Sequence, residues 1–369
     1  MTLPLLKNNM SLYWEYKKYA NDVNYFANDE DGRCTLTLAL TCSLYFWNGH
    51  TADVRMKLVE CFERFEHLFK DQLKWVMPPE DLSSRAKEVK IDHPKLPQFR
   101  NYVQSLDENT PLEWFVSGGK SADEASDCFI GCLVEAKWQF ETNGDMSYIS
   151  FAIPILTSHP KKTNLELFQQ FIRFCCERLN PVNGLAGLST VIPYDSGKYQ
   201  GDEFEAHNRY YGLNTNNDDW DFTKNPNELK TTSWLTILSP QMQQLARDKG
   251  IHLDSAWLNE PRIKQYKIGQ TLVIQAGAEP RLAPVTKGKP ALYKKVNDVL
   301  KPLRIKEACL HIGTSSNQVE FDTPLSAKWL SRLDDDGQWP AFPDWVNYHG
   351  VDETISDDLT GDEPTSAEK

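Results

Sequence analysis

Two short motifs in this 369-residue chain have residue types that could bind an ion. Gly118-Gly119-Lys120-Ser121 ends like a phosphate-binding P-loop, but the position that needs the first glycine of that loop is Trp114. Asp334-Asp335-Asp336-Gly337 begins like a calcium loop. With Gly337 as the invariant glycine, however, Arg332 would be the first ligand and Pro343 the twelfth. Neither motif is therefore expected to bind its ion.

The other common catalytic motifs are missing from the sequence. No Gly-x-Ser-x-Gly, His-Glu-x-x-His or Gly-x-Gly-x-x-Gly pattern occurs, and the eight histidines are scattered. The eight cysteines form no Cys-x-x-Cys pair, and most lie in apolar patterns, where a free cysteine acts as a small hydrophobe. This usage fits the reduced cytoplasm. We therefore expect no enzyme, with no catalytic residues, no cofactor and no metal.

Charge offers a different kind of chemistry, namely recognition of a basic partner. The net charge is −12, and no basic stripe of the kind that nucleic-acid readers carry is visible, so direct nucleic-acid binding is not expected. Residues 201–221 hold six acids against one arginine, with tyrosines and a tryptophan among them. Such a stretch is either a solvated loop or a surface that attracts a basic protein and anchors it through its aromatic rings. On the second interpretation the partner-binding residues are Tyr199, Glu203, Glu205, Tyr210, Tyr211, Asp218, Asp219 and Trp220.

The C-terminal end carries most of the negative charge. Residues 334–369 have a net charge of −10, and residues 1–333 only −2. Residues 349–369 contain no aromatic side chain and are expected to form an acidic disordered tail. The aromatic-rich stretch 337–348 either folds back onto the body or presents a second set of partner-binding residues, Trp339, Asp344 and Trp345.

Alternating and helical hydrophobic patterns predict the elements of the first half. Residues 34–52 are uncharged, but their leucines fall on one parity, which indicates a strand and not a membrane span. A helix is predicted through about residue 76, then strands at 128–141 and 146–157 joined by a hairpin turn at 143–145. A helix at 164–179 and a strand at 185–192 complete the order β-α-β-β-α-β. No secretory signal or membrane segment is expected.

The second half is predicted to repeat this order. Strands are expected at 233–238, 264–268, 271–276 and 308–312, with helices from Ser239 to Gly250, from Pro290, and from Pro324 to Leu333 with Thr323 as the N-cap. The predicted fold is α+β, with duplicated β-α-β-β-α-β units, antiparallel or mixed sheets and helices on one face. The predicted organisation is a first half at 1–195, a second half at 196–348 fused to it in one body, and the tail at 349–369.

One region resembles a known family. Residues 271–304 resemble the C-terminal signature of the type VI secretion immunity family that is paired with VRR-Nuc nuclease effectors. The similarity lies in Ile274-Gln275-Ala276-Gly277, in Pro280, in the helix with Tyr293 and Val296, and in residues 300–304. Residues 180–194 and 233–238 also look like the family, and the resemblance extends over about residues 30–345.

The resemblance implies a binding protein without turnover. It would bind a cognate type VI secreted nuclease in the cytoplasm, as a 1:1 complex, and block the access of DNA to the basic cleft of that toxin. Two alternatives remain open: a structural or adaptor component of a secretion system, and immunity to another toxin that acts in the cytoplasm.

Overall fold

The computed structural model describes residues 10–24, 32–77, 89–159, 162–193, 199–215, 220–257, 259–310 and 321–345. The predicted tail at 349–369, together with Asp218 and Asp219, lies outside these residues.

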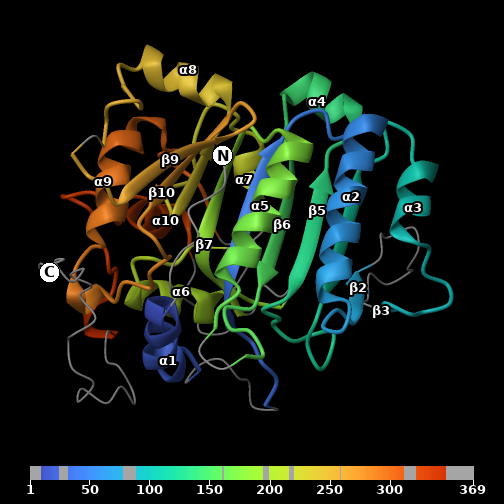
Figure 1. Cartoon of the computed structure of the whole chain (residues 1–369), viewed down its shortest axis with the longest axis horizontal. Coiled ribbons are helices and arrows are strands. Elements are labelled where there is room, and N and C mark those ends of the chain that lie inside the picture. The colour runs from blue at the N-terminus through green and yellow to red at the C-terminus, as the bar shows by residue number, and fades with distance from the viewer. Residues whose placement is uncertain are drawn as a thin grey trace, which may run out of the picture.

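The strands form one antiparallel sheet of ten strands in the order β3-β2-β4-β5-β6-β1-β7-β8-β10-β9 (Figure 1). Both halves of the chain contribute, because β7 pairs with β1 on one side and with β8 on the other. The fold is therefore α+β with one continuous sheet. The strands are β1 (Thr37–Phe46), β2 (Trp75–Met77), β3 (Val89–Lys90), β4 (Leu112–Ser117), β5 (Phe129–Val134), β6 (Ser147–Ile153), β7 (Asn183–Val191), β8 (Leu235–Leu238), β9 (Ile263–Ile268) and β10 (Thr271–Ala276).

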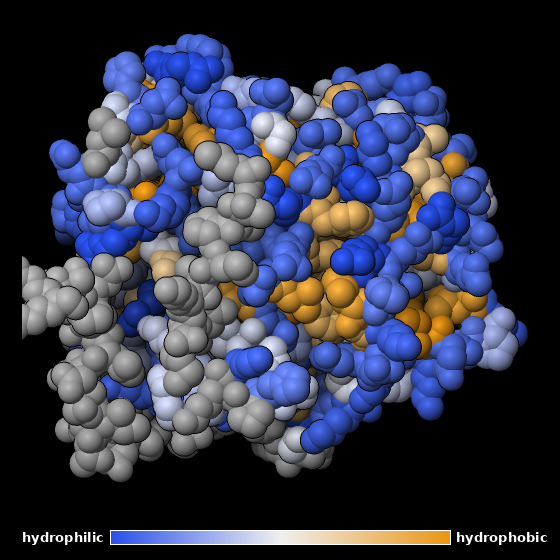
Figure 2. Space-filling view, in the orientation of Figure 1, coloured by the Kyte–Doolittle hydropathy of each residue, from blue (hydrophilic) through white to orange (hydrophobic). Residues whose placement is uncertain are grey.

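Helices α2 and α5 lie side by side over one face of the first half of the sheet (Figure 1). Figure 2, in the same orientation, shows apolar side chains reaching the surface along the seam between them. The helices are α1 (Met10–Asn24), α2 (Ala52–Phe69), α3 (Phe99–Ser105), α4 (Lys137–Asn143), α5 (Leu165–Leu179), α6 (Gln200–Arg209), α7 (Trp220–Thr223), α8 (Pro240–Asp248), α9 (Ala291–Leu300) and α10 (Thr323–Leu330). Short 3₁₀ turns occur at Val285–Lys287, Lys301–Leu303 and Pro343–Trp345.

The core is built from β1, which is buried on both faces along most of its length, and from the apolar stripes of α2 and α5. Phe65 on α2, Phe151 on β6 and Phe171 on α5 are almost fully buried. The ring of Phe171 lies 5.3 Å from Phe65 and 4.7 Å from Phe151, within the range of favourable aromatic packing. The predicted strand over 34–46 is confirmed as β1. No helix in the described part of the chain is long and apolar enough to cross a bilayer.

The predictions for the first half need two corrections. The first helix ends at Phe69 and not near residue 76, because Trp75–Met77 leaves the helix and pairs with β4 as strand β2. The predicted hairpin turn at 143–145 is wrong. Gly144 ends helix α4 in the left-handed conformation, with φ at 72°, and its N–H donates to the carbonyl oxygen of Phe140. Strands β5 and β6 do pair, but helix α4 connects them in place of a tight turn.

The second half confirms β8, α8, β9, β10 and α9. Helix α10 is capped by Asp322, whose carboxylate accepts from the N–H of Leu325, and not by Thr323. The predicted closing strand is wrong at 308–310, which has no strand structure, and its last two positions lie outside the described residues. The duplicated β-α-β-β-α-β pattern is therefore not confirmed, and the domain boundary at 195/196 stays a prediction.

The eight cysteines are all free thiols. Six are buried, and Cys34 and Cys309 are partly exposed. Burial is the largest cause that raises the pKa of the Cys42 thiol, so this side chain packs as a neutral apolar group. The prediction that most cysteines serve as small hydrophobes is confirmed.

Candidate functional site

Most of the acidic and aromatic residues chosen from 199–211 lie inside the protein. Helix α6 turns Glu203 inward with no exposed surface, and the backbone after the helix buries Tyr210 and Tyr211. Tyr199 is also buried. The prediction that these four side chains form an exposed surface is wrong, because helical spacing places Glu203 on the same inner face as His207. Glu205 is only partly buried and pairs with Arg209 within hydrogen-bonding distance.

A buried polar cluster explains why α6 can carry a carboxylate into the core. The Thr190 hydroxyl donates to Glu203 Oε1 at 2.8 Å and lies 3.2 Å from His207 Nε2. The indole N–H of Trp329 donates to His207 Nδ1 at 3.2 Å. These contacts tie α6 to β7 and to α10. Because His207 and Glu203 are fully buried, the cluster stabilises the fold and offers no surface to a partner.

The aromatic stretch at 337–348 folds back onto the body at its described end. The indole N–H of Trp339 donates to the carbonyl oxygen of His207 at 2.9 Å, and the hydroxyl of Tyr211 donates to the carbonyl oxygen of Trp339 at 2.8 Å. Trp339 is 4% exposed, so the prediction that it is a surface contact is wrong. The alternative prediction, that this stretch folds back onto the body, is confirmed for Trp339. Asp344 is exposed and stays a candidate contact. The side chains of Trp220 and Trp345 lie outside the description.

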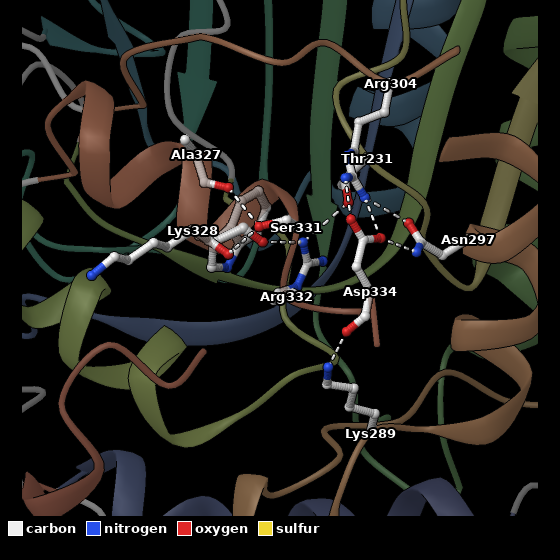
Figure 3. A network of polar contacts seen from close by, with 10 residues as sticks. Thr231, Lys289, Asn297, Arg304, Ala327, Lys328, Ser331, Arg332 and Asp334 are labelled. Carbon is white, nitrogen blue, oxygen red and sulfur yellow. Dashed lines mark hydrogen bonds and ion pairs between the residues drawn. The ribbon is translucent and has the colours of Figure 1, made fainter. Parts of the chain in front are cut away.

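Asp334 is not part of a solvated acidic run. Its carboxylate accepts two hydrogen bonds from Arg304, at 2.6 and 2.9 Å, and one from the Asn297 side-chain amide at 2.7 Å (Figure 3). Lys289 donates to its backbone carbonyl oxygen. Although burial alone would raise the pKa of Asp334, the bonds from Arg304 and Asn297 hold it below its usual value. This residue fastens the chain after α10 to α9.

Arg332 lies beside this ion pair and is completely buried (Figure 3). Its guanidinium donates to Thr231 Oγ1 and to the carbonyl oxygen of Tyr211, both at 3.0 Å, and lies 3.8 Å from the ring centre of Trp329. Burial lowers the pKa of Arg332 to about 9, helped by the nearby charge of Arg304, so the group is still a cation at neutral pH. Its partners are carbonyls, a hydroxyl and an aromatic face.

The P-loop-like segment at 118–121 is occupied by the protein itself. The backbone N–H groups of Lys120 and Ser121 donate to the Glu124 carboxylate at 2.7 and 3.1 Å. The segment lines a cavity of about 410 Å³ together with Cys34 and Asp71. Since Glu124 already accepts from the N–H groups that would hold a phosphate, this segment is not a phosphate-binding loop.

A surface that the sequence analysis did not select lies around α4, at the upper edge of the sheet in Figure 1. Trp138 is 56% exposed, the most of any large apolar side chain in the described residues. None of the seven residues of α4 is buried. Lys137 pairs with Glu108 at 2.7 Å, and the charges of Glu108 and Glu141 both act on it. We call this surface the α4 edge and define it by Glu108, Glu135, Trp138, Glu141 and Asp145.

Two buried acids flank helix α4, with Glu135 just before it and Asp145 just after it. Glu135 and Asp145 are 4% and 6% exposed, and one oxygen of Asp145, Oδ1, has no hydrogen-bond partner among the described residues. Burial raises the pKa of Glu135 to about 7, and the neighbouring Asp145 adds to the rise, while Lys224 opposes it. The protein therefore keeps Glu135 beside a second carboxyl group, at a site that disfavours the charge of Glu135.

The α4 edge also contacts the end of helix α7, which follows the acidic segment 201–221 in the chain. The N–H of Met146, at the start of β6, donates to the carbonyl oxygen of Thr223 at the end of α7 at 2.8 Å. On the neighbouring strands the exposed Glu113 lies opposite Leu133, two residues before Glu135. Sequence reasoning missed this surface because its acids are spread over residues 108–145 and the α4 segment was read as strand.

Replacing Glu135 with glutamine is expected to flatten the pH dependence of stability. The folded-state pKa of about 7 lies above the unfolded value, so the protonated carboxyl stabilises the fold below about pH 4.5. That stability is lost as the pH rises through 7. Between pH 5 and pH 8 the wild-type chain should lose on the order of 2 kcal/mol of unfolding free energy relative to Glu135→Gln.

Urea unfolding at pH 5, 6.5 and 8 measures this difference. The exposed Glu177 on α5 provides the control, since Glu177→Gln should follow the wild-type curve at each pH. Parallel curves for the wild type and Glu135→Gln would contradict a raised pKa at this carboxyl.

Comparison with known proteins finds a matching family and similar solved structures. A family model described as type VI immunity for VRR-NUC matches residues 57–333. Among solved structures, the chain is similar to the "Pseudomonas aeruginosa T6SS protein PA0821", with 26% sequence identity and a TM-score of 0.73 over 83% of this chain and 85% of that one. A search of curated proteins found no match. The α4 edge lies inside the region that the family model covers.

Proposed function

Because the chain belongs to the family of type VI immunity proteins for VRR-Nuc effectors, we propose that it neutralises one cognate effector by binding its nuclease domain and keeping DNA out of the catalytic cleft. The single observation that carries this proposal is the family match over residues 57–333. The similarity to a type VI secretion protein of known structure supports the same role.

Charge supports the mode of inhibition. A nuclease must present positive charge to the phosphates of its substrate, and this chain has a net charge of −12. An acidic protein can therefore compete with DNA for the same cleft, and opposite charges speed the encounter. The family is one of immunity proteins, which implies stoichiometric binding and not turnover. We place the complex in the cytoplasm, where the DNA to be protected lies, with one copy of each protein.

Co-expression with the cognate effector tests this proposal. Cells that produce the intact effector should survive only when this chain is present, and their chromosomal DNA should stay uncut. The chain and an effector with disabled catalytic residues should elute from a sizing column as a 1:1 complex with a dissociation constant of nanomolar or below, beyond roughly −12 kcal/mol. The association rate should fall at least about tenfold between low and physiological salt.

Two results would contradict the proposal. Survival without protection of the DNA would point to a different toxin activity. A well-folded chain that forms no complex with the effector would remove the cognate-inhibitor role and favour the adaptor alternative. An immunity protein for an unrelated effector from the same secretion system serves as the matched negative control.

A further inference from the structure

We propose that the α4 edge is the surface that receives the effector, with an arginine of the nuclease domain stacking on Trp138 and donating to Asp145. The inference rests on the proposed function and adds the surface and the chemistry of the group that it binds.

The exposure of Trp138 is the first observation. An indole that is 56% exposed on a helix without a single buried residue adds little to the fold, since burial is what makes apolar area stabilising. Tryptophan is also the residue most enriched at the energetic centres of protein interfaces. Its ring face attracts a cation, and arginine more often than lysine. The side chain is thus placed to gain its burial from a partner.

The unsatisfied carboxylate of Asp145 is the second and independent observation. The only hydrogen bond to Asp145 among the described residues comes from the side-chain amide of Asn143 to Oδ2 at 3.1 Å, which leaves Oδ1 buried without a donor. A buried acceptor without a partner costs free energy, and a guanidinium can satisfy it. The adjacent Glu135 would share the same cation and would be relieved of the repulsion between the two acids.

The surrounding charges select a basic protein partner. Glu108 and Glu141 lie near each other at the rim, and Lys137 is already paired with Glu108. Glu113 adds a further exposed carboxylate on the neighbouring strand. Nucleic acid would be repelled by these acids, whereas the basic rim of a DNA-binding cleft matches them.

Helix α4 is held in place before any partner binds. The N–H of Ala136 donates to Gln139 Oε1 at 2.8 Å at one end, and Gly144 closes the other. Phe140 packs on His50, with ring centres 5.2 Å apart. Next to His50, Gly49 lies so close to β6 that a Cβ there would overlap Ser147. A preorganised surface loses little entropy on binding, which favours tight association.

Four variants test the inference against the catalytically disabled effector. Trp138→Ala should weaken binding by roughly 30-fold or more, as expected for an interface centre. Glu141→Lys should weaken it about tenfold, mainly by slowing association. Trp14→Ala on α1, where the indole is 40% exposed, and Glu177→Lys on α5 are the matched controls and should bind like the wild type. Melting temperatures of all four should stay within about 2 °C of the wild type, because none of these side chains is buried.

The outcomes distinguish failure of the α4 edge from failure of the proposed function. If Trp138→Ala and Glu141→Lys both bind the effector with wild-type affinity, the α4 edge is overturned and the proposed function still stands. Failure of the wild-type chain itself to bind or protect would overturn both. Asp145→Asn, which keeps the shape and the bond from Asn143, decides the role of the carboxylate: a loss of about tenfold or more supports capture of a cation, and unchanged affinity contradicts it.

Discussion

Replacing Arg332 with alanine should lower the free energy of unfolding by about 3–5 kcal/mol, because a fully buried cation and all the hydrogen bonds of its side chain would be lost together. Its guanidinium bonds to the carbonyl oxygens of Tyr211 and Trp329 and to the Thr231 hydroxyl, groups in three separate segments. Alanine would remove the donors to the Tyr211 carbonyl oxygen and the Thr231 hydroxyl and would open a cavity over the Trp329 ring.

Denaturant unfolding at pH 7 with two companion variants measures this effect. Arg332→Lys keeps the charge but not the planar fork, so it should lose about half as much. Arg262→Ala removes an arginine that also makes two hydrogen bonds, to Glu260, but whose side chain is 68% exposed. Its expected loss is at most about 1 kcal/mol. Equal losses for Arg332→Ala and Arg262→Ala would show that burial of the guanidinium does not set its contribution.

Replacing Gly212 with alanine should lower the free energy of unfolding by a similar amount, about 3–5 kcal/mol, because the added Cβ has no room. A Cβ at this position would overlap the carbonyl oxygen of Arg281 and lie 2.8 Å from that of Leu282. The two backbones are held together by bonds from the N–H of Gly212 to Leu282 and from the N–H of Tyr211 to Ala283, each 2.9 Å long. The segments would have to separate, which combines overpacking with the loss of buried hydrogen bonds.

Gly250 supplies the contrasting control for this variant. It adopts a positive φ of 75° after α8, with open space where a Cβ would be. Gly250→Ala should therefore cost only the backbone strain of about 1–2 kcal/mol. If Gly212→Ala unfolds at the same denaturant concentration as Gly250→Ala, the close approach of the two segments is not what requires glycine at 212.

These two positions clarify how loss of protection in cells is to be interpreted. Variants of Arg332 and Gly212 should lose immunity by unfolding, with a lowered melting temperature. Variants of Trp138 and Glu141 should lose it with an unchanged melting temperature. Measuring stability and affinity for the same variants therefore separates residues that build the protein from residues that meet the effector.

Elements with strong local signals were predictable from the sequence. The strand β1, the serine cap and glycine stop of α8, and the apolar stripe of α5 each depend on neighbouring residues and are confirmed, although β1 is buried on both faces and not on one. Helix α4 and strand β4 were missed. The first has no buried stripe to give a helical period, and the second lies in a polar stretch whose pairing partners are distant in the chain.

The candidate site was harder to predict, for a physical reason. The acids and tyrosines at 199–211 resemble surface residues because charge is normally solvated. Thr190 and Trp329, from distant parts of the chain, bond to Glu203 and His207 and allow Glu203 to be buried. Asp334 likewise resembles part of the acidic tail, because its partner Arg304 lies 30 residues away along the chain. The exposure of Trp138 depends on what the rest of the fold leaves uncovered, which composition does not reveal.

The absence of buried residues in α4 has an evolutionary consequence. Apart from Gln139, which caps the helix, and Phe140, which packs on His50, the residues of α4 can be exchanged at little cost in stability, whereas positions such as Arg332 or Gly212 are bound to the fold. Recognition located on such a helix is separable from folding by mutation. A lineage whose effector changes its basic rim can follow that change by rewriting this short segment, while the ten-stranded sheet beneath it is inherited intact.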